Sequence, residues 1–350
     1  MSHKLQMTKR TCEIKKLLTL KKKPVPLSLH LKALNYSLCS VAVNTIKGYI
    51  SAGRSFLTFL KNNLKKPSAI VDSDILCQFV VHEAEIKKLK MDSLRTKLSC
   101  LKKFYEFFQV SMCISDNELE NTLKGIESFD FRGKRQAAAI QGSHLELLEK
   151  HFMTLTQTDS RRCLSLEQIQ VMTLFSVAQN GCFRMSEVLN LKWDQLKFSA
   201  IAIEITLSRS KTNQRGGPQL ISIVKHEGDH CSAYEWIQLY KTLCPRNEED
   251  WLFPDLSDYS QSIKTRKFNK MVKQYAEVMI MDPSTVSSHS FRAGGATDLV
   301  FNGASELDVK RQGRWKSSVM VDNYFRPTNV QFQTKLISLN ATRGKFEYGI

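Results

Sequence analysis

The sequence lacks several patterns that would place it in common protein classes. It contains no run of about 18 apolar residues, so a transmembrane helix of ordinary length is not indicated. It also contains no CxxC pair, no internal repeat and no long low-complexity tract. Residues 1–20 are basic and interrupted by charges, unlike a secretory signal. We therefore expect a protein that is neither secreted nor a partner of membranes.

The cysteines do not show the spacing of a disulfide framework. The nine positions are scattered, and an odd count favours buried thiols in a reducing compartment over disulfides. His226, His230 and Cys231 lie close together, but no second ligand pair follows them. A zinc site is therefore not indicated, and we interpret this stretch as a solvated loop.

Acidic residues are few compared with basic ones. The 350-residue chain has 51 Lys and Arg against 34 Asp and Glu, a formal net charge of +17. Such an excess favours a polyanionic partner, with nucleic acid ahead of a membrane surface. A basic protein with a merely solvated surface is the alternative that charge leaves open. The length suggests one large or two medium domains.

The N-terminal third predicts a small helical domain. Residues 1–40 form a basic flexible leader, which could be a nuclear address or a DNA-backbone contact. Residues 41–125 show apolar positions at helical spacing, and a further helix is expected near Asn117–Leu123. The expected apolar faces are Ile46, Ile50, Gly53, Leu57, Leu60 and Leu64; Ile75, Leu76, Phe79 and Val80; and Leu94, Leu98, Leu101, Tyr105 and Phe108.

Basic residues lie on the other faces of these helices. Arg54, Arg95 and Lys102 are the candidates for contacts with a DNA backbone. Such residues can equally be solvated. Residues 126–142 lose the hydrophobic periodicity and are interpreted as a linker.

Residues 143–330 predict a mainly helical domain with a small antiparallel sheet. Ser143 with Glu146, and Ser165 with Gln168, have the spacing of capping boxes at helix starts. Two β-like runs follow, at 200–207 with Ile201, Ile203 and Ile205 on one face, and at 220–224. The remaining expected elements are a polar hairpin at 208–217, helices near 186–191, 264–279, 290–302, 305–311 and 318–324, and a tail at 331–350.

Side chains suited to phosphate chemistry occur in this second region. Arg184 and Arg292 can each bind phosphate oxygens through a planar guanidinium that stays charged. Trp315 can donate its indole N–H, and His289 can donate a hydrogen bond or accept a proton. Together these groups could stabilise the charge that gathers on a phosphodiester under attack.

A nucleophile and a proton donor complete this hypothesis. Tyr324 is the candidate nucleophile, and its ordinary pKa of about 10 means that nearby cations or a base must activate it. Lys211, on the predicted hairpin, could protonate the leaving 5′-oxygen. Glu187 could orient Arg184 or His289, although an ordinary carboxylate at a helix start is as plausible.

The joint pattern resembles the tyrosine recombinases of the phage-integrase superfamily. The first-arginine box is Arg184-Met185-Ser186-Glu187, and the His-x-x-Arg box is His289 to Arg292. The hairpin lysine of the family corresponds to Lys211. Nine positions separate Trp315 from Tyr324, as is usual in the family. One departure is Gly313-Arg314-Trp315, where the family usually has Leu-Gly-His or Leu-Gly-Trp.

The resemblance implies a fold, an activity and an assembly. It implies that residues 41–125 form an all-α, SAM-like core-binding domain and residues 143–330 an α+β catalytic domain. It implies DNA cleavage and rejoining through a 3′-phosphotyrosyl intermediate, without metal or ATP. It implies a homotetramer on two sites in double-stranded DNA. Together with the basic leader and the many cysteines, the Gly-Arg-Trp box favours a eukaryotic mobile-element or virus-borne enzyme of the Crypton or DIRS kind. The protein is expected to be nuclear if it is eukaryotic and cytoplasmic otherwise.

Two alternative functions share much of this sequence pattern. A domesticated, non-catalytic DNA-binding protein would keep the basic surfaces without the reaction. A type IB topoisomerase-like enzyme would use similar chemistry to relax DNA without exchanging strands. The helical region before the catalytic one favours the recombinase.

Overall fold

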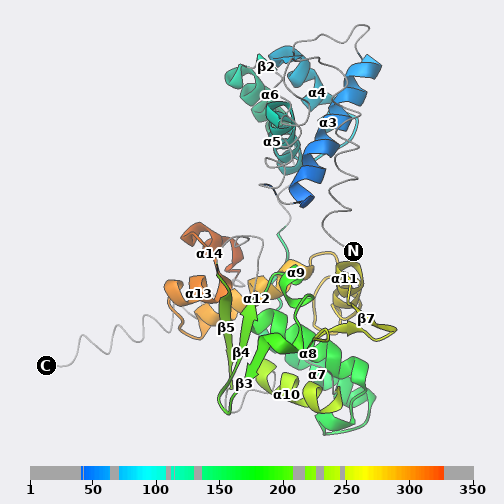
Figure 1. Cartoon of the computed structure of the whole chain (residues 1–350), viewed down its shortest axis with the longest axis vertical. Coiled ribbons are helices and arrows are strands. Elements are labelled where there is room, and N and C mark those ends of the chain that lie inside the picture. Colours follow the sequence, from blue (N-terminus) through cyan, green and yellow to red (C-terminus); the bar gives the residue numbers. More distant parts are fainter. Residues whose placement is uncertain are drawn as a thin grey trace, which may run out of the picture. The chain divides into compact units, whose positions relative to one another are not determined.

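The computed structural model describes residues 41, 43–63, 71–107, 112–113, 115–129, 136–207, 217–225, 232–244 and 249–326. The chain divides into two compact units, which we call unit 1 (Met1–Lys134) and unit 2 (Arg135–Ile350) (Figure 1). None of the helices in the described ranges is both long enough and apolar enough to cross a membrane.

The described part of unit 1 consists mainly of four helices. They are α3 (Val43–Asn63), α4 (Ser73–Glu85), α5 (Met91–Phe107) and α6 (Asp116–Phe129). In addition, the two-residue strands β1 (Val71–Asp72) and β2 (Met112–Cys113) pair in parallel, so this unit is not purely α-helical. The helix α6 ends at Phe129, inside the linker predicted at 126–142, so the predicted start of the linker was too early.

The apolar faces of unit 1 largely follow the predicted spacing in α3, α4 and α5, with Leu57 as an exception, whereas Leu64 and Phe108 lie outside the described residues. The residues predicted to face inward in α4 are all buried. In α3, Leu57 is 43% exposed, whereas Phe56 and Phe59 are buried. Phe56 lies edge-on to Phe79 and Tyr105, with ring centroids 5.0 and 5.9 Å apart. Ile46, Gly53 and Leu60 of α3 are buried as predicted, and Phe56 and Phe59 take the place expected for Leu57 because their aromatic rings bury more apolar area.

Unit 2 contains the larger core, and α8 (Leu166–Asn180) lies at its centre. Nearly every residue of α8 from Ile169 to Gln179 is buried, as expected for a helix that is surrounded on all sides. The longer helices that contact it include α7 (Gly142–Leu155), α10 (Ala233–Leu243) and α12 (Ser288–Phe301). The other helices of unit 2 are α9 (Met185–Val188), α11 (Thr265–Gln274), α13 (Glu306–Gly313), α14 (Ser318–Tyr324), and the 3₁₀ turns η1 (Arg161–Cys163) and η2 (Trp193–Gln195).

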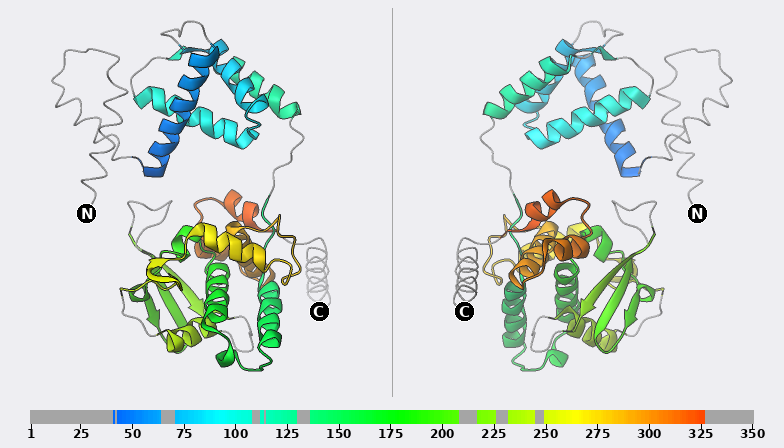
Figure 2. Two further views of the ribbon diagram at one scale, coloured as in Figure 1. Left: turned by 90° about the vertical axis from the view of Figure 1, so that its right-hand side faces the viewer. Right: turned by 90° about the vertical axis from the view of Figure 1, so that its left-hand side faces the viewer.

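A three-stranded antiparallel sheet lies on one flank of the helices of unit 2 (Figure 2). Its strands are β3 (Leu196–Phe198), β4 (Ala202–Leu207) and β5 (Gln219–Val224). Ile203 and Ile205 are buried, as predicted, and they pair in register with Ile223 and Ile221. Ile201 precedes the strand and is 73% exposed, so its predicted place on the inner face was wrong. A further antiparallel pair joins β6 (Pro254–Asp255) to β7 (Asp258–Ser262).

The ends of the helices of unit 2 differ from the expectation at several points. Ser165 and Gln168 form the predicted capping box of α8. The helix α7 instead starts at Gly142, and the backbone N–H of Gln141 donates to His144 Nδ1 at 3.0 Å. The capping box predicted at Ser143 was therefore wrong. The helices predicted at 186–191 and 264–279 are shorter, ending at Val188 and Gln274.

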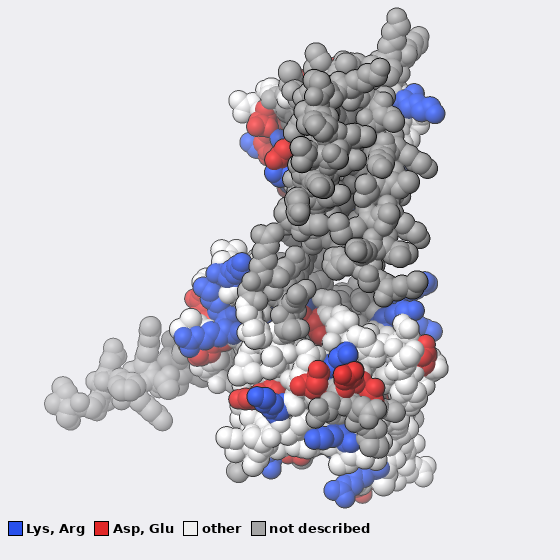
Figure 3. All heavy atoms as spheres, in the orientation of Figure 1, with Lys and Arg blue, Asp and Glu red and all other residues white. Residues whose placement is uncertain are grey.

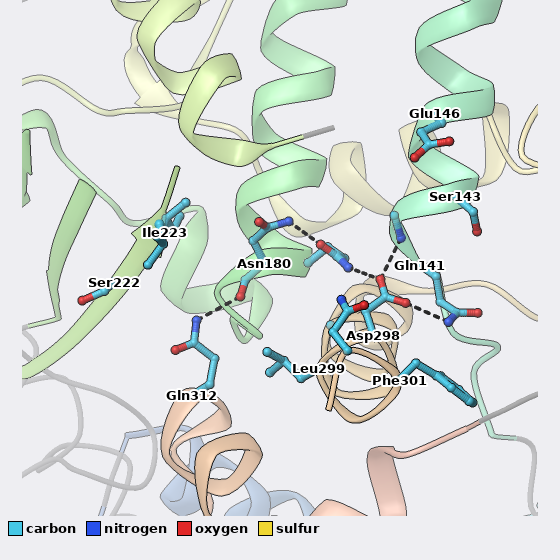
Figure 4. Close-up of a pocket in the computed structure, with 15 residues that line it drawn as sticks. Gln141, Ser143, Glu146, Asn180, Ser222, Ile223, Asp298, Leu299, Phe301 and Gln312 are labelled. Carbon is cyan, nitrogen blue, oxygen red and sulfur yellow. Dashed lines mark hydrogen bonds between the residues drawn. The ribbon is translucent and has the colours of Figure 1, made fainter. Parts of the chain in front are cut away.

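The carboxylate of Asp298 ties α12 to α7 and α8 (Figure 4). It accepts hydrogen bonds from Gln141 Nε2 at 2.8 Å, from the Gly142 N–H at 2.8 Å and from Gln179 Nε2 at 2.5 Å. A cavity of about 670 Å³ lies beside this network. Gln312 of α13 lines the same cavity and donates to the carbonyl of Asn180 at 3.0 Å. These polar contacts fix α12 and α13, which carry site residues, against the central helix.

Candidate active site

Most of the predicted site residues lie at helix ends of unit 2. The corner between α8 and α9 is tight, because Gly181 is the C-cap of α8 and Cys182 has a positive φ of 44°. This geometry turns the backbone carbonyl of Cys182 toward α12 and α13. The site residues are Arg184 at the N-cap of α9, His289 and Arg292 in α12, Trp315 directly after α13, and Tyr324 at the end of α14.

Arg292 is the buried centre of the site. Its guanidinium donates to the backbone carbonyls of Cys182 and Gly313, and only 1% of the residue is exposed. The guanidinium carbon lies 4.6 Å from the ring centroid of Trp315 and 5.4 Å from that of Tyr324. One side chain thus joins the α8–α9 corner, the end of α13 and the tyrosine.

Tyr324 is oriented by the residues around its ring. The rings of Trp315 and Tyr324 are stacked, with centroids 5.2 Å apart and planes 27° apart. The hydroxyl of Tyr324 lies 3.5 Å from Nδ1 of His289. The side chain of Tyr324 is half-buried, so its hydroxyl stays accessible beside a group that can accept its proton.

Glu187 connects two arginines. Its carboxylate accepts from Arg184 Nη1 at 2.6 Å and from Arg314 Nη2 at 2.8 Å, and its side chain is 2% exposed. It also accepts from the backbone N–H of Arg184 at 2.9 Å. Burial by itself would raise the pKa of Glu187, but Arg314 and Arg184 outweigh burial and lower it. The sequence suggested a support for Arg184 or an ordinary carboxylate at a helix start, and the contacts of Glu187 include both kinds.

This arrangement predicts a pH-dependent contribution of Glu187 to stability. The folded-state pKa lies below 4.5, so the stabilisation is complete above pH 4.5 and is lost as the pH falls through the folded value. Because removing one partner of a buried ion pair costs about 3–5 kcal/mol, we expect Glu187→Gln to lose that much stability at pH 7. The difference from wild type should shrink in acid.

Tryptophan fluorescence during denaturant unfolding can measure this effect, because all four tryptophans of the chain lie in unit 2. Glu277→Gln, at an exposed position of unit 2, is the matched control and should change little at any pH. A Glu187→Gln deficit that stays constant down to acid would show that the charge of Glu187 contributes nothing.

The site carries an excess of positive charge. Burial, together with the neighbouring charges of Arg184 and Arg314, lowers the pKa of Arg292 to about 10, so its guanidinium remains protonated at neutral pH. The guanidinium groups of Arg184 and Arg314 bond to the carboxylate of Glu187, whereas that of Arg292 bonds to backbone carbonyls. Within the described part of the chain, the buried Nε of Arg292 and Nε1 of Trp315 have no hydrogen-bond partner. Cationic and N–H groups so placed can bind an anion such as a phosphate.

The remaining predicted residues lie elsewhere. Lys211 falls outside the described residues. In unit 1, Arg95 donates to both carboxylate oxygens of Glu120, at 3.0 and 3.1 Å, and Lys102 pairs with Asp116 at 2.8 Å. These carboxylates offset the two positive charges, so their role toward DNA stays a prediction. The same holds for Arg54, whose side chain is exposed.

Two features were not assigned from the sequence. Arg314 had been noted only as a departure from a motif, yet it is buried and bonded to Glu187. The second is a basic face on α11, which the spacing of its cations around the buried Phe268 and Val272 could have revealed. Among the described residues, no group of three or more His, Cys, Asp or Glu is arranged to hold a metal ion.

The sequence matches a family and several of its characterised members. The model of the phage integrase family matches residues 147–330. An integrase/recombinase xerD homolog of Selenomonas ruminantium is 26% identical over 160 residues, which are 43% of this chain and 45% of that protein. A tyrosine recombinase of Pseudothermotoga lettingae is 24% identical over 265 residues, 75% of this chain and 80% of the other. The chain thus spans less than half of the first relative and most of the second.

Solved structures share the fold. The XerH site-specific recombinase bound to its difH substrate, in a pre-cleavage complex, superposes with a TM-score of 0.58 at 12% identity. That alignment covers 95% of this chain and 94% of the other. A lambda integrase dimer bound to a COC′ core site gives a TM-score of 0.57 at 12% identity, over 87% and 97% of the two chains. The fold of this chain is therefore that of known DNA recombinases.

Proposed function

This chain belongs to the phage integrase family of tyrosine recombinases, and we propose that it cleaves and rejoins duplex DNA at specific sites through Tyr324. One observation carries this proposal. The hydroxyl of Tyr324 lies beside His289, and its ring stacks on Trp315 next to the buried guanidinium of Arg292. A nucleophile, a proton acceptor and phosphate-binding cations thus meet at one place.

The proposed reaction has two balanced steps. The Tyr324 oxygen attacks the scissile phosphorus, and His289 is placed to accept the phenolic proton. The bond from phosphorus to the 5′-oxygen breaks, giving a 3′-phosphotyrosyl ester and a free 5′-hydroxyl. The leaving oxygen takes up a proton, for which Lys211 is the candidate donor. A 5′-hydroxyl then attacks the ester, restores the diester and releases Tyr324.

Arg184 and Arg292 have a shared task in both steps. The transition state gathers negative charge on the non-bridging oxygens of the phosphate, and preorganised donors stabilise that charge. Arg184 is held by Glu187, and Arg292 by two backbone carbonyls, so neither needs to reorganise during the reaction. Exchange between two DNA sites would require several copies of the chain, and we propose a homotetramer.

A covalent-trapping assay tests the proposed function. Nicked duplexes tiled across the DNA that adjoins the gene are incubated with the full chain, and protein–DNA adducts that survive denaturation are counted. An adduct is expected on a small subset of the duplexes. A plasmid with two copies of that sequence should then yield recombinants. Relaxation without recombinants would indicate a topoisomerase-like enzyme, and binding without any adduct would indicate a non-catalytic DNA-binding protein.

The basic face of α11 is the surface that we propose for the DNA backbone beside the site. Lys264, Arg266, Lys270 and Lys273 are exposed, whereas Lys267 pairs with Asp255 at 2.7 Å. Figure 3 shows basic side chains over α11, and others over α13, on the face that it draws. The helix α11 adjoins the site, because the Ser288 N–H, next to His289, donates to Asn269 Oδ1 at 3.2 Å.

This surface predicts a change in the salt dependence of DNA binding. Each neutralised phosphate contributes about −0.9 to the slope of log K against log salt. The triple variant Lys264→Ala, Arg266→Ala and Lys270→Ala should therefore flatten the slope by up to about 2.7, as measured by fluorescence anisotropy. The matched control removes the same charge at exposed lysines of unit 2 outside α11: Lys150→Ala, Lys225→Ala and Lys241→Ala. Equal slopes for the two triple variants would contradict a role for α11.

A further inference from the structure

Arg314 adopts a backbone conformation that side chains usually avoid. It follows the end of α13 with φ 54° and ψ 42°, in the left-handed region that favours glycine. Only 9% of the surface of Arg314 is exposed to solvent. A buried arginine in an unfavourable backbone conformation requires compensating contacts, and those contacts indicate its role.

The four terminal N–H bonds of Arg314 are all directed at the α8–α9 corner and the end of α13. Nη1 donates to the carbonyls of Gly181 at 3.0 Å and Gln312 at 2.8 Å. Nη2 donates to the carbonyl of Cys182 at 3.2 Å and to Glu187 at 2.8 Å. The guanidinium carbon also lies 5.1 Å from the ring centroid of Phe183. With both terminal nitrogens engaged, Arg314 has no terminal N–H left to donate to a DNA phosphate, and its remaining N–H, at Nε, is unpaired but buried.

The partners of Arg314 are the groups that hold the two proposed catalytic arginines. Glu187, which accepts from Arg314, also accepts from Arg184. The carbonyl of Cys182, which accepts from Arg314, also accepts from Arg292. The next residue in the chain, Trp315, stacks on Tyr324. Arg314 therefore contacts the supports of both guanidinium groups and precedes the ring that orients the nucleophile.

We propose that Arg314 is a positioning residue that sets the geometry of Arg184, Arg292 and Trp315 for DNA cleavage without touching the DNA. This proposal rests on the function proposed above. Its physical basis is that the buried carboxylate of Glu187 holds Arg184 in place only while a second cation holds the carboxylate. Loss of Arg314 would leave Glu187 and the carbonyl of Cys182 with one donor fewer each, and the catalytic groups would shift.

The test compares variants of Arg314 in the full chain. Single-turnover formation of the covalent adduct, DNA affinity and thermal melting are measured for Arg314→Met and Arg314→Lys. Because small misplacements at a reacting centre can cost about 100-fold in rate, Arg314→Met should cleave roughly 100-fold more slowly. DNA affinity should stay within about 3-fold, since Arg314 neutralises no phosphate. Arg314→Lys, which keeps the charge beside Glu187, should recover part of the rate. Arg162→Met, which removes an exposed arginine of the turn η1 in unit 2, is the matched control and should cleave like wild type.

A double-mutant cycle separates positioning from simple stabilisation. If Arg314 acts through Glu187, then Arg314→Met combined with Glu187→Gln should be little slower than the slower single variant. Independent, multiplying effects, or a wild-type rate in folded Arg314→Met, would overturn the proposal while leaving the proposed function intact. If Arg314→Met does not fold, Arg314→Lys decides, and a wild-type rate in that variant together with a wild-type rate in Glu187→Gln would overturn it. Absence of any adduct from wild-type protein would overturn the proposed function, and the role of Arg314 with it.

Discussion

The Tyr324→Phe variant is expected to form no covalent adduct with DNA while binding it as tightly as wild type. The substitution removes only the hydroxyl, which lies 3.5 Å from His289 Nδ1. The ring that stacks on Trp315 and lies 5.4 Å from the guanidinium of Arg292 remains. Loss of a nucleophile typically costs roughly 10⁴-fold or more in rate, because no other group can form the covalent intermediate.

Adduct formation and DNA affinity should be measured on the same nicked duplex. Tyr275→Phe is the matched control, because Tyr275 is half-buried in unit 2 and lies edge-on to Phe152 with centroids 5.3 Å apart. It should form adducts like wild type. An adduct that persists in Tyr324→Phe would assign the nucleophile to another residue. Loss of affinity in that variant would show that the hydroxyl of Tyr324 acts in binding instead of chemistry.

The helices of the fold were largely predictable from local patterns. The inward faces of α4 and the buried core of β4 follow from the spacing of their apolar residues, as does the start of α8 from Ser165 and Gln168. The errors arose where tertiary packing decides between similar faces. In α3, Phe56 and Phe59 are buried, whereas Leu57 is exposed. The spacing of apolar residues alone would allow any of these three residues to lie on an apolar face.

The sequence predicted which residues form the site, but not the hydrogen bonds that join them. The motifs supplied Arg184, His289, Arg292, Trp315 and Tyr324, which the structure brings together. Spacing along the chain could not reveal Arg314 as a partner of Glu187, because 127 positions separate the two residues. The pairing depends on a left-handed residue at the end of α13 and another at the α8–α9 corner. Such backbone turns are set by the packing of helices that are distant in sequence.

The Arg292→Lys variant is expected to cleave DNA about 1,000-fold more slowly than wild type. Lysine keeps the charge, but its single ammonium cannot reproduce the planar fork that donates to the carbonyls of Cys182 and Gly313. Removing one preorganised donor from a transition state typically costs about 10²–10³ in rate, and here the geometry of the Trp315 stack is lost as well. The carbonyl of Gly313, which loses Arg292 as its donor, should also destabilise the fold by about 1–3 kcal/mol, whereas that of Cys182 still accepts from Arg314.

Stability must therefore be separated from chemistry in this variant. The cleavage rate is measured well below the melting temperature and expressed per folded molecule, as judged by tryptophan fluorescence. Arg161→Lys is the matched control, because Arg161 bonds to Glu149 and lies over the ring of Trp236 in the core of unit 2. Both variants should melt earlier than wild type, but only Arg292→Lys should lose cleavage. Equal rates per folded molecule for Arg292→Lys and wild type would mean that Arg292 stabilises the fold but not the transition state. Of the two arginines, Arg184 alone would then stabilise the charge on the phosphate.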